Sequence, residues 1–220
     1  MQRLTLFDLD HTLLSGDSDV LWCDFLIAQG EINGAVFKAR NADIDARYQN
    51  GSISVQEFSN FYLSTLAGRS PGQWHGLRKR YFASEILPRL PQAAMDLVRS
   101  HLDAGDLVLL TSATNRFLSE LTAAALGIEH LIGTEPELQD GVFTGRASGV
   151  LNMREGKVTR LHAWLAGRGQ SLARFHSTAY SDSMNDLPLL EAVNEAVAVD
   201  PDPRLAVIAK ERGWRVLNLR

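Results

Sequence analysis

The sequence predicts an α/β fold, in which a Rossmann-like, doubly wound parallel sheet carries an inserted all-helical segment. From about residue 88 to the last residue, helical and strand signals alternate with short links, and strands joined through helices lie parallel with helices on both faces. An earlier stretch of helical spacing separates this series from a single strand near the first residue. The 220 residues, of which 45% are hydrophobic, suffice for one large domain with an insert.

The first strand and the insert precede the alternating series. Residues 4–9 are apolar at all but two positions, as in a buried strand. In the insert, apolar side chains recur at helical spacing, with breaks at Asn50-Gly51 and at Ser70-Pro71-Gly72. The expected division of the chain is a core of residues 1–14 and 88–220 and a helical cap of residues 15–87.

The alternating series begins after two prolines, Pro88 and Pro91, which interrupt the helical insert. The expected elements are a helix at 92–104, a strand at 107–111, a helix at 116–126, a hairpin within 132–145, a helix at 157–165, a strand at 175–180, a helix at 187–192, a strand at 196–199, a helix at 204–212 and a strand at 215–219. The hairpin is expected because Asp140-Gly141 separates two short strand-like runs.

The composition argues against nucleic acid, membranes, disulfides and structural zinc. The chain has 22 basic and 26 acidic residues, a formal charge of −4, so it offers no basic field to nucleic acid. Cys23 is the single cysteine, which excludes an internal disulfide and a zinc ribbon. No apolar run approaches the roughly 18 residues that span a bilayer, and no secretion signal is recognisable. We expect a cytoplasmic protein without membrane or nucleic-acid partners.

Polar side chains gather at the ends of three expected strands. They are Asp8 and Asp10, then Thr111 and Ser112, then Ser181, Asp182, Asn185 and Asp186. Ligands of open parallel sheets bind beyond the carboxyl ends of the strands, where the strand order reverses. Converging carboxylates repel one another unless a cation lies between them, and Mg²⁺ is a hard cation that binds carboxylates together with a substrate phosphate. With Ser112 and Lys157 to hold phosphate oxygens, these residues predict a phosphoryl-transfer site.

Each of these residues also has a structural interpretation. Polar residues after strands often cap the next helix, and an isolated Lys157 is most often a solvated surface residue. A calcium loop that starts at Asp8 fails, because its sixth position is Leu13 instead of glycine and its twelfth is Asp19 instead of glutamate. The run Arg78-Lys79-Arg80 is typical of a solvated helix face. The ordered recurrence of polar strand ends favours the functional interpretation.

Four short segments carry a family resemblance. They are FDLDHTLL at 7–14, TSAT at 111–114, GK at 156–157 and SDSMND at 181–186. Together they resemble the four ordered motifs of haloacid dehalogenase-type phosphatases, and the placement and helical character of the insert are similar to the phosphoserine phosphatase-like branch. The resemblance implies a magnesium-dependent phosphomonoesterase that acts on a small phosphorylated metabolite beneath a helical cap.

The resemblance also implies roles for the matching residues. Asp8 is the nucleophile that forms an aspartyl-phosphate, and Asp10 protonates the leaving alkoxide and later takes a proton from the attacking water. The other implied roles are Mg²⁺ binding by the Asp8 carboxylate, the Asp10 backbone carbonyl and Asp182, phosphate binding by Ser112, the Ala113 amide and Lys157, and supporting or substrate contacts by Thr12, Asp17, Asn185 and Asp186. Phosphatases and mutases of the superfamily keep an acid at the Asp10 position, whereas its ATPases do not.

Substrate choice is expected to lie in the cap. Phosphoserine phosphatases that resemble this chain bind the substrate ammonium with a cap glutamate, where this chain has Asp17. They bind the substrate carboxylate with a cap arginine, but here no basic residue stands between Arg47 and Arg69. We therefore expect an amine-bearing phosphate without a carboxylate. Four aromatic residues could supply a stacking wall for it, although each of them taken singly is more typical of the core of the cap: Trp22, Phe61, Tyr62 and Trp74.

Histidinol phosphate is the favoured substrate, because it carries an amine and an imidazole but no carboxylate. The chain also resembles a bacterial subgroup, through FDLDHTLLSGDSD and MREGKVTRL, for which histidinol-phosphate hydrolysis is one implied function. A phosphoserine phosphatase or a broad-specificity phosphatase is the alternative among enzymes. A phosphate-binding regulatory protein that has lost turnover is the alternative outside them.

Overall fold

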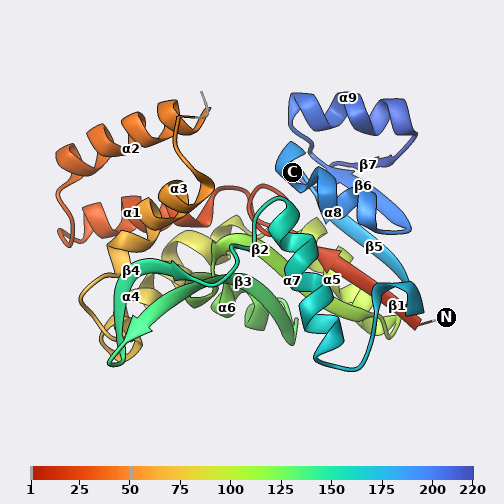
Figure 1. Cartoon of the computed structure of the whole chain (residues 1–220), viewed down its shortest axis with the longest axis horizontal. Coiled ribbons are helices and arrows are strands. Elements are labelled where there is room, and N and C mark those ends of the chain that lie inside the picture. The colour runs from red at the N-terminus through yellow and green to blue at the C-terminus, as the bar shows by residue number, and fades with distance from the viewer. Residues whose placement is uncertain (1, 50–51) are drawn as a thin grey trace.

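A seven-stranded sheet forms the centre of the computed structural model, which describes residues 2–49 and 52–220 (Figure 1). The strands are β1 (Gln2–Phe7), β2 (Leu107–Asn115), β3 (His130–Gln139), β4 (Val142–Ser148), β5 (Phe175–Ser181), β6 (Glu195–Val199) and β7 (Arg215–Leu217). Their order in the sheet is β4-β3-β2-β1-β5-β6-β7, and neighbours are parallel except for the antiparallel pair β3–β4. The mostly parallel sheet confirms the predicted fold class.

Helices fill the connections. The α-helices are α1 (Ser18–Ala28), α2 (Gly34–Gln49), α3 (Val55–Leu63), α4 (Pro71–Tyr81), α5 (Gln92–Asp103), α6 (Arg116–Ala125), α7 (Glu155–Ala166), α8 (Leu187–Ala192) and α9 (Pro203–Arg212). Short turns of other helix types are η1 (Ser64–Leu66), η2 (Phe82–Ile86), η3 (Leu87–Arg89), η4 (Leu172–Arg174) and η5 (Met184–Asp186). None of the described helices is long and apolar enough to cross a membrane.

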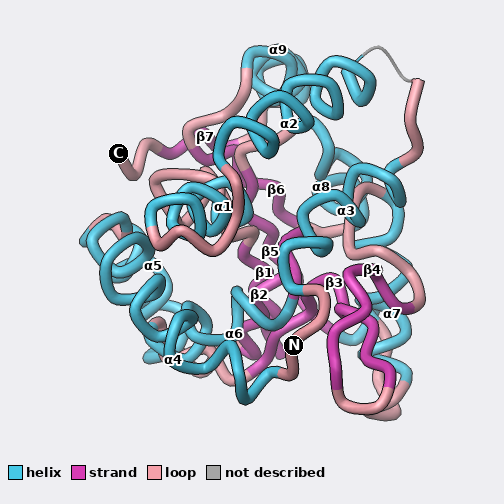
Figure 2. Tube along the Cα trace, turned by 90° about the vertical axis from the view of Figure 1, so that its left-hand side faces the viewer, coloured by secondary structure: helices cyan, strands magenta, loops and turns pink. Residues whose placement is uncertain are grey.

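Both faces of the sheet are covered, because successive side chains of each strand point to opposite sides. Phe7 of β1 joins one hydrophobic cluster, with residues of α5 and α6, whereas Leu4 and Leu6 join a second cluster with residues of α7, α8 and α9. Figure 2 shows the strands at the centre, with α5 on one side and α7 and α8 on the other. The sheet is therefore doubly wound, as predicted.

Some strand boundaries differ from those expected. β1 ends at Phe7 instead of Leu9, because the Leu9 carbonyl accepts hydrogen bonds from the backbone N–H groups of residues 12, 13 and 14 and the chain turns away from the sheet. β2 continues to Asn115, with a shift of its register against β3 after Thr111. The hairpin is confirmed, since Asp140-Gly141 forms its turn with φ values of 50° and 77°.

The helices of the insert contribute to two hydrophobic clusters. Trp22, Phe25 and Tyr81 belong to the same hydrophobic cluster as Phe7 of the sheet, so α1 and α4 pack directly on the core. Phe61 of α3 belongs to a smaller cluster with Phe37 of α2, and α3 also contacts β4, where the Ala147 N–H donates to Asn60 Oδ1 at 2.9 Å. The break at Ser70 is confirmed, since Ser70 caps α4, whereas Asn50-Gly51 lies outside the described residues. The division into core (1–14, 88–220) and cap (15–87) stays our proposal.

Candidate active site

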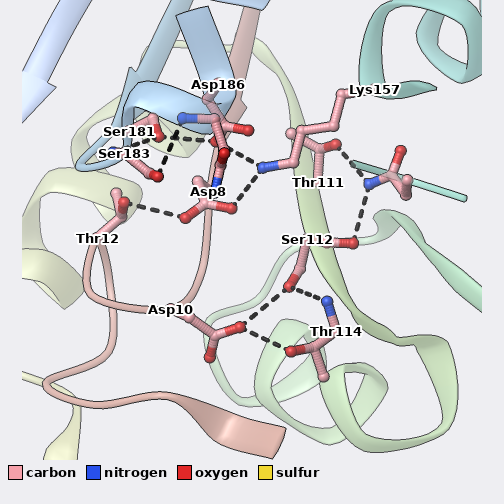
Figure 3. Close-up of polar contacts among 12 residues, drawn as sticks. Asp8, Asp10, Thr12, Thr111, Ser112, Thr114, Lys157, Ser181, Ser183 and Asp186 are labelled. Atoms are coloured by element: carbon pink, nitrogen blue, oxygen red, sulfur yellow. Dashed lines mark hydrogen bonds and ion pairs between the residues drawn. The ribbon is translucent and has the colours of Figure 1, made fainter. Parts of the chain in front are cut away.

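The polar strand ends meet at one edge of the sheet. β1 lies between β2 and β5, so the chain order of the strands reverses there. Asp8 follows β1 directly, Ser112 lies near the end of β2 and Asp182 follows β5. The Asp8 N–H donates to the Tyr180 carbonyl at 3.0 Å, which extends the β1–β5 pairing and holds Asp8 in place. Figure 3 shows Lys157 pointing toward Asp8, and Ser112 pointing toward Asp10 and Thr114.

Lys157 is a buried cation shared by two carboxylates. It extends from the first turn of α7, and its Nζ lies 2.7 Å from Asp8 Oδ1 and 2.6 Å from Asp186 Oδ2. Burial by itself lowers the pKa of the Lys157 amine, but the charges of Asp186 and Asp8 outweigh this and hold that pKa above its usual value. Ser181 also donates to Asp186 Oδ2 at 2.7 Å. The surface-residue interpretation of Lys157 is therefore wrong.

Asp8 and Asp182 lie on either side of the Thr12 hydroxyl. Thr12 Oγ1 is 3.2 Å from Asp8 Oδ2 and 3.0 Å from Asp182 Oδ1, and it accepts a hydrogen bond from the Asp182 N–H. Burial raises the pKa of Asp8 well above its usual value, against Lys157 and with help from neighbouring carboxylates, and burial raises the pKa of Asp182 to about 6. Two neighbouring carboxylates whose ionisation is disfavoured would be stabilised in their charged form by a hard divalent cation.

This pair is not a metal cage made of side chains alone. The described part of the chain contains no group of three or more His, Cys, Asp or Glu side chains arranged for a metal. A site that combines two carboxylates with a backbone carbonyl, as expected for Mg²⁺, is compatible with this, because Mg²⁺ usually keeps several waters and uses few protein ligands.

The Asp10 carboxylate is turned toward β2 and the start of α1. Its Oδ2 accepts a hydrogen bond from Thr114 Oγ1 at 2.7 Å, and its Oδ1 accepts one from the Ser18 N–H at 2.8 Å. Ser18 Oγ in turn donates to Thr114 Oγ1 at 3.0 Å. Sequence reasoning assigned no role to Thr114 or Ser18, although Thr114 belongs to the TSAT segment at 111–114.

Ser112 and Ala113 have different positions relative to the cavity. Ser112 is fully buried. Its Oγ donates a hydrogen bond to Asp10 Oδ2 at 3.4 Å and accepts one from the Thr114 N–H at 3.1 Å. Ala113 and Thr114 line the cavity, but Ser112 is not among the described residues that do. The strand therefore presents the Ala113 segment to the space in front of Asp8.

The cavity has a volume of about 270 Å³ and lies between the sheet edge and the helical insert. Its lining from the core comprises Asp8, Asp10, His11, Ala113, Thr114, Met153, Lys157, Asp182, Ser183, Asn185 and Asp186, and its lining from the insert comprises Asp17, Asp19, Phe58, Ser59 and Tyr62. Most of the predicted site residues therefore line one cavity. Ser112 and Thr12 are not among its lining residues, but both are hydrogen-bonded to residues that are.

Two aspartates of the insert lie at the cap side of this cavity. Asp17 is the N-cap residue of α1, where its Oδ1 accepts a hydrogen bond from the Val20 N–H at 2.9 Å. Asp19, which sequence reasoning did not place in the site, accepts a hydrogen bond from Asn115 Nδ2 at 3.2 Å. Burial, Asp17 and Asp10 together raise the pKa of Asp19 well above its usual value. A positively charged group in the cavity would relieve this repulsion.

Of the four aromatic residues weighed for a stacking wall, Tyr62 lines the cavity, whereas the cap-core interpretation holds for the other three. Trp22 and Trp74 are buried in the hydrophobic cluster, with their indole N–H groups donating to Thr65 Oγ1 at 3.1 Å and to the Leu66 carbonyl at 2.9 Å, and Phe61 packs in the smaller cluster. The second aromatic residue of the wall is Phe58, one helical turn before Tyr62.

Other structural interpretations are also resolved. Asp186 occupies the N-cap position of α8 without a side-chain capping bond, because its carboxylate binds Lys157. Arg78 does not belong to a solvated face. It is buried, 4.4 Å above the Phe117 ring, and pairs with Glu120 at 3.0 Å, while Lys79 is exposed. The prediction of a solvated run is therefore wrong at Arg78.

Comparison with known proteins identifies sequence relatives over the whole chain. Residues 5–191 match the family model described as haloacid dehalogenase-like hydrolase. A histidinol-phosphatase of Neisseria meningitidis serogroup C (strain 8013) is 42% identical over 100% of both chains. A phosphoserine phosphatase of Mycobacterium tuberculosis is 32% identical, with 97% of this chain aligned to 70% of that protein.

Solved structures share the fold. A protein of unknown function from Bordetella pertussis Tohama I is 46% identical over 100% of both chains and has a TM-score of 0.96 to this structure. A substrate-bound phosphoserine phosphatase has a TM-score of 0.67 at 18% identity, covering 99% of this chain and 93% of that one. At this identity the second likeness concerns the fold alone.

Proposed function

This chain belongs to the haloacid dehalogenase-like hydrolase family and is a phosphatase, and from this premise we propose that it hydrolyses histidinol phosphate through an aspartyl-phosphate on Asp8, with Mg²⁺ as cofactor. The observation that carries the proposal is the make-up of one cavity. Its core side holds Asp8, Asp10 and Lys157, and its cap side holds carboxylates and aromatic rings. The relative that is 42% identical is a histidinol-phosphatase, which agrees with this composition.

Each step of the reaction uses a residue of the core side. The Asp8 carboxylate attacks phosphorus, and the bond from phosphorus to the leaving alkoxide breaks while Asp10 gives that oxygen a proton. Water then attacks the phosphorus of the aspartyl-phosphate, Asp10 takes a proton from it, and inorganic phosphate leaves Asp8 free. The bonds from Thr114 and Ser18 support this role, because they hold the Asp10 carboxyl in one orientation.

The residues present fit a magnesium ion. Its ligands would be the carboxylates of Asp8 and Asp182 and the backbone carbonyl of Asp10. The raised pKa values of Asp8 and Asp182 support a cation here, since its charge would favour the ionised form of both. When bound, Mg²⁺ supplies positive charge against the phosphoryl oxygens. Lys157 adds a fixed positive charge next to Asp8.

The cap side of the cavity suits an amine and an imidazole. Asp17 and Asp19 would attract the substrate ammonium, and Phe58 and Tyr62 would pack against the imidazole ring. A substrate carboxylate would meet an acidic wall instead. The basic side chains among the described lining residues are His11 and Lys157, and Lys157 is already bound to two carboxylates.

The test is steady-state phosphate release from histidinol phosphate, phosphoserine and an aryl phosphate, with Mg²⁺ and with a chelator. We expect kcat/KM for histidinol phosphate to exceed that for phosphoserine about a hundredfold, since like charges brought together in a site cost several kcal/mol. Chelation should abolish turnover of all three. A flat profile would contradict the substrate proposal, a preference for phosphoserine would favour the alternative, and chelator-resistant turnover would contradict the cofactor.

Asp17→Asn should weaken binding of amine substrates without unfolding α1. Asparagine is as good an N-cap as aspartate, so the Val20 N–H keeps its acceptor while the negative charge is lost. We expect KM for histidinol phosphate to rise roughly tenfold with little change in kcat, and KM for an aryl phosphate to stay constant. Asp24→Asn, an exposed position on the same helix, is the matched control. Equal KM values for wild type and Asp17→Asn would remove Asp17 from the substrate site.

A further inference from the structure

Asn152 is a fully buried polar residue in the loop before α7, outside the wall of the cavity. Its Nδ2 lies 2.9 Å from each of three oxygens, which are Thr111 Oγ1, the Ser112 carbonyl and the Ile132 carbonyl. Its backbone N–H donates to Thr134 Oγ1 at 3.3 Å. The Asn152 side chain therefore joins β2 to β3 next to Ala113, the residue of β2 that lines the cavity.

The orientation of the Asn152 amide follows from the chemistry of its neighbours. The carbonyl oxygens of Ser112 and Ile132 can only accept hydrogen bonds, so the NH₂ group must face them. Turning the amide over would bring Oδ1 against both carbonyls. In the observed orientation, Oδ1 is buried without a hydrogen-bond partner among the described residues, which is energetically unfavourable. The hydrogen bonds that Asn152 Nδ2 donates thus stabilise this orientation by more than the unpaired Oδ1 destabilises it.

The Ser112 carbonyl and the Ala113 N–H belong to one peptide unit. In a trans peptide these groups point in opposite directions, and the described chain contains no cis peptide bond. Asn152 holds the carbonyl on the buried side, so the N–H is turned to the other side, where Ala113 lines the cavity. We propose that Asn152 is a positioning residue, which holds this peptide so that the Ala113 N–H donates to a bound phosphoryl group or inorganic phosphate.

The same loop also delivers Lys157. Gly156 follows Asn152 closely and packs so tightly that a Cβ at this position would lie 2.0 Å from the Leu151 carbonyl oxygen. The loop therefore folds back on itself before α7 begins, and Lys157 extends from that first turn to Asp8. Asn152, which bonds the Ser112 carbonyl, and Lys157, which bonds Asp8, therefore come from one short segment of the chain. The inference rests on the proposed function in taking the cavity as the phosphate site.

The test compares Asn152→Ala and Asn152→Asp with Thr134→Val. Thr134→Val removes the acceptor of the Asn152 backbone N–H but leaves the bond from Asn152 Nδ2 to the Ser112 carbonyl intact. It is therefore the matched control. Asp has the volume of Asn but fewer donors, and it keeps the test valid if the Ala variant does not fold. The measurements are the inhibition constant of inorganic phosphate, kcat and KM for an aryl phosphate, and the thermal midpoint of each variant.

We expect both Asn152 variants to weaken phosphate inhibition and to lower kcat/KM about tenfold or more, since a misdirected donor stabilises the phosphoryl charge less. Thr134→Val should keep both values within about threefold, even where its thermal midpoint falls. Wild-type phosphate affinity in a folded Asn152→Asp protein would overturn the proposal, as would an equal loss in Thr134→Val. Inorganic phosphate and the aryl phosphate carry no amine, so these measurements do not depend on the identity of the substrate. Equal kcat/KM values in the comparison of histidinol phosphate with phosphoserine would contradict the substrate proposal and leave the role of Asn152 unaffected.

Discussion

Asp8→Asn should abolish turnover of every phosphate ester, with a loss of roughly a thousandfold or more in kcat, because an amide cannot form the aspartyl-phosphate. The fold should persist, since asparagine has the same shape and Lys157 retains its bond to Asp186 at 2.6 Å. Acid quenching of the wild-type enzyme during turnover should trap phosphate on the protein. The Asp8→Asn protein should trap none.

A matched control separates loss of the nucleophile from loss of a buried carboxylate. Asp106 is also buried and hydrogen-bonded, to Thr5 Oγ1 at 3.0 Å and His101 Nδ1 at 2.7 Å, but it lies outside the cavity. Asp106→Asn should reduce stability and leave kcat within a few-fold of wild type. Turnover by Asp8→Asn at a rate comparable to that of Asp106→Asn would exclude Asp8 as the nucleophile.

Lys157→Met should lower both activity and stability. The amine of Lys157 compensates two buried carboxylates, Asp8 and Asp186, and removal of one partner from a buried ion pair typically costs about 3–5 kcal/mol. We expect a loss of that order in the free energy of unfolding at neutral pH, measured with urea. The kcat should fall about a hundredfold or more, since a preorganised charge next to the phosphoryl group is lost.

The stability loss in Lys157→Met should shrink as the pH falls. Burial already raises the pKa of Asp8 in the folded protein, and without Lys157 this pKa stands still further above its unfolded value. The folded variant then binds more protons than the unfolded chain, so its stability rises from about pH 7 toward about pH 5. Lys79→Met, at an exposed position, is the control. Equal destabilisation at both pH values would contradict the buried-pair explanation.

The positions of the residues proposed to be catalytic were predictable, because Asp8 and Asp182 directly follow strands and Lys157 lies in the first turn of a helix. Hydrophobic periodicity locates β1, β2 and β5, and parallel strands place their carboxyl ends at one edge. Asp8, Asp182 and Lys157 therefore meet as expected, although they are far apart in the chain. Family resemblance adds the distinction between a nucleophile and an acid. Neither argument gives the direction of a side chain, which is why the bonds from Thr114 and Ser18 to Asp10 were missed.

The aromatic residues show where periodicity stops being informative. Apolar spacing identifies Trp22, Trp74 and Phe61 as residues of helices with a buried face, but burial against a core and exposure to a cavity leave the same pattern in sequence. Tertiary packing places Trp22, Trp74 and Phe61 in hydrophobic clusters. The indole N–H groups of both tryptophans found hydrogen-bond partners inside the cluster, and the cavity wall received Phe58 and Tyr62 instead.

The doubly wound sheet, the helical insert and the phosphatase chemistry could all be predicted from the order of the residues, because they depend on local periodicity and on motifs at strand ends. Which side chains line the cavity and which support them from behind depends on how distant segments pack together. Asn152 is the clearest case, since its partners on β2 and β3 are 18 to 41 residues away in the chain. Contacts of this kind follow from how the elements pack, and no local pattern records them.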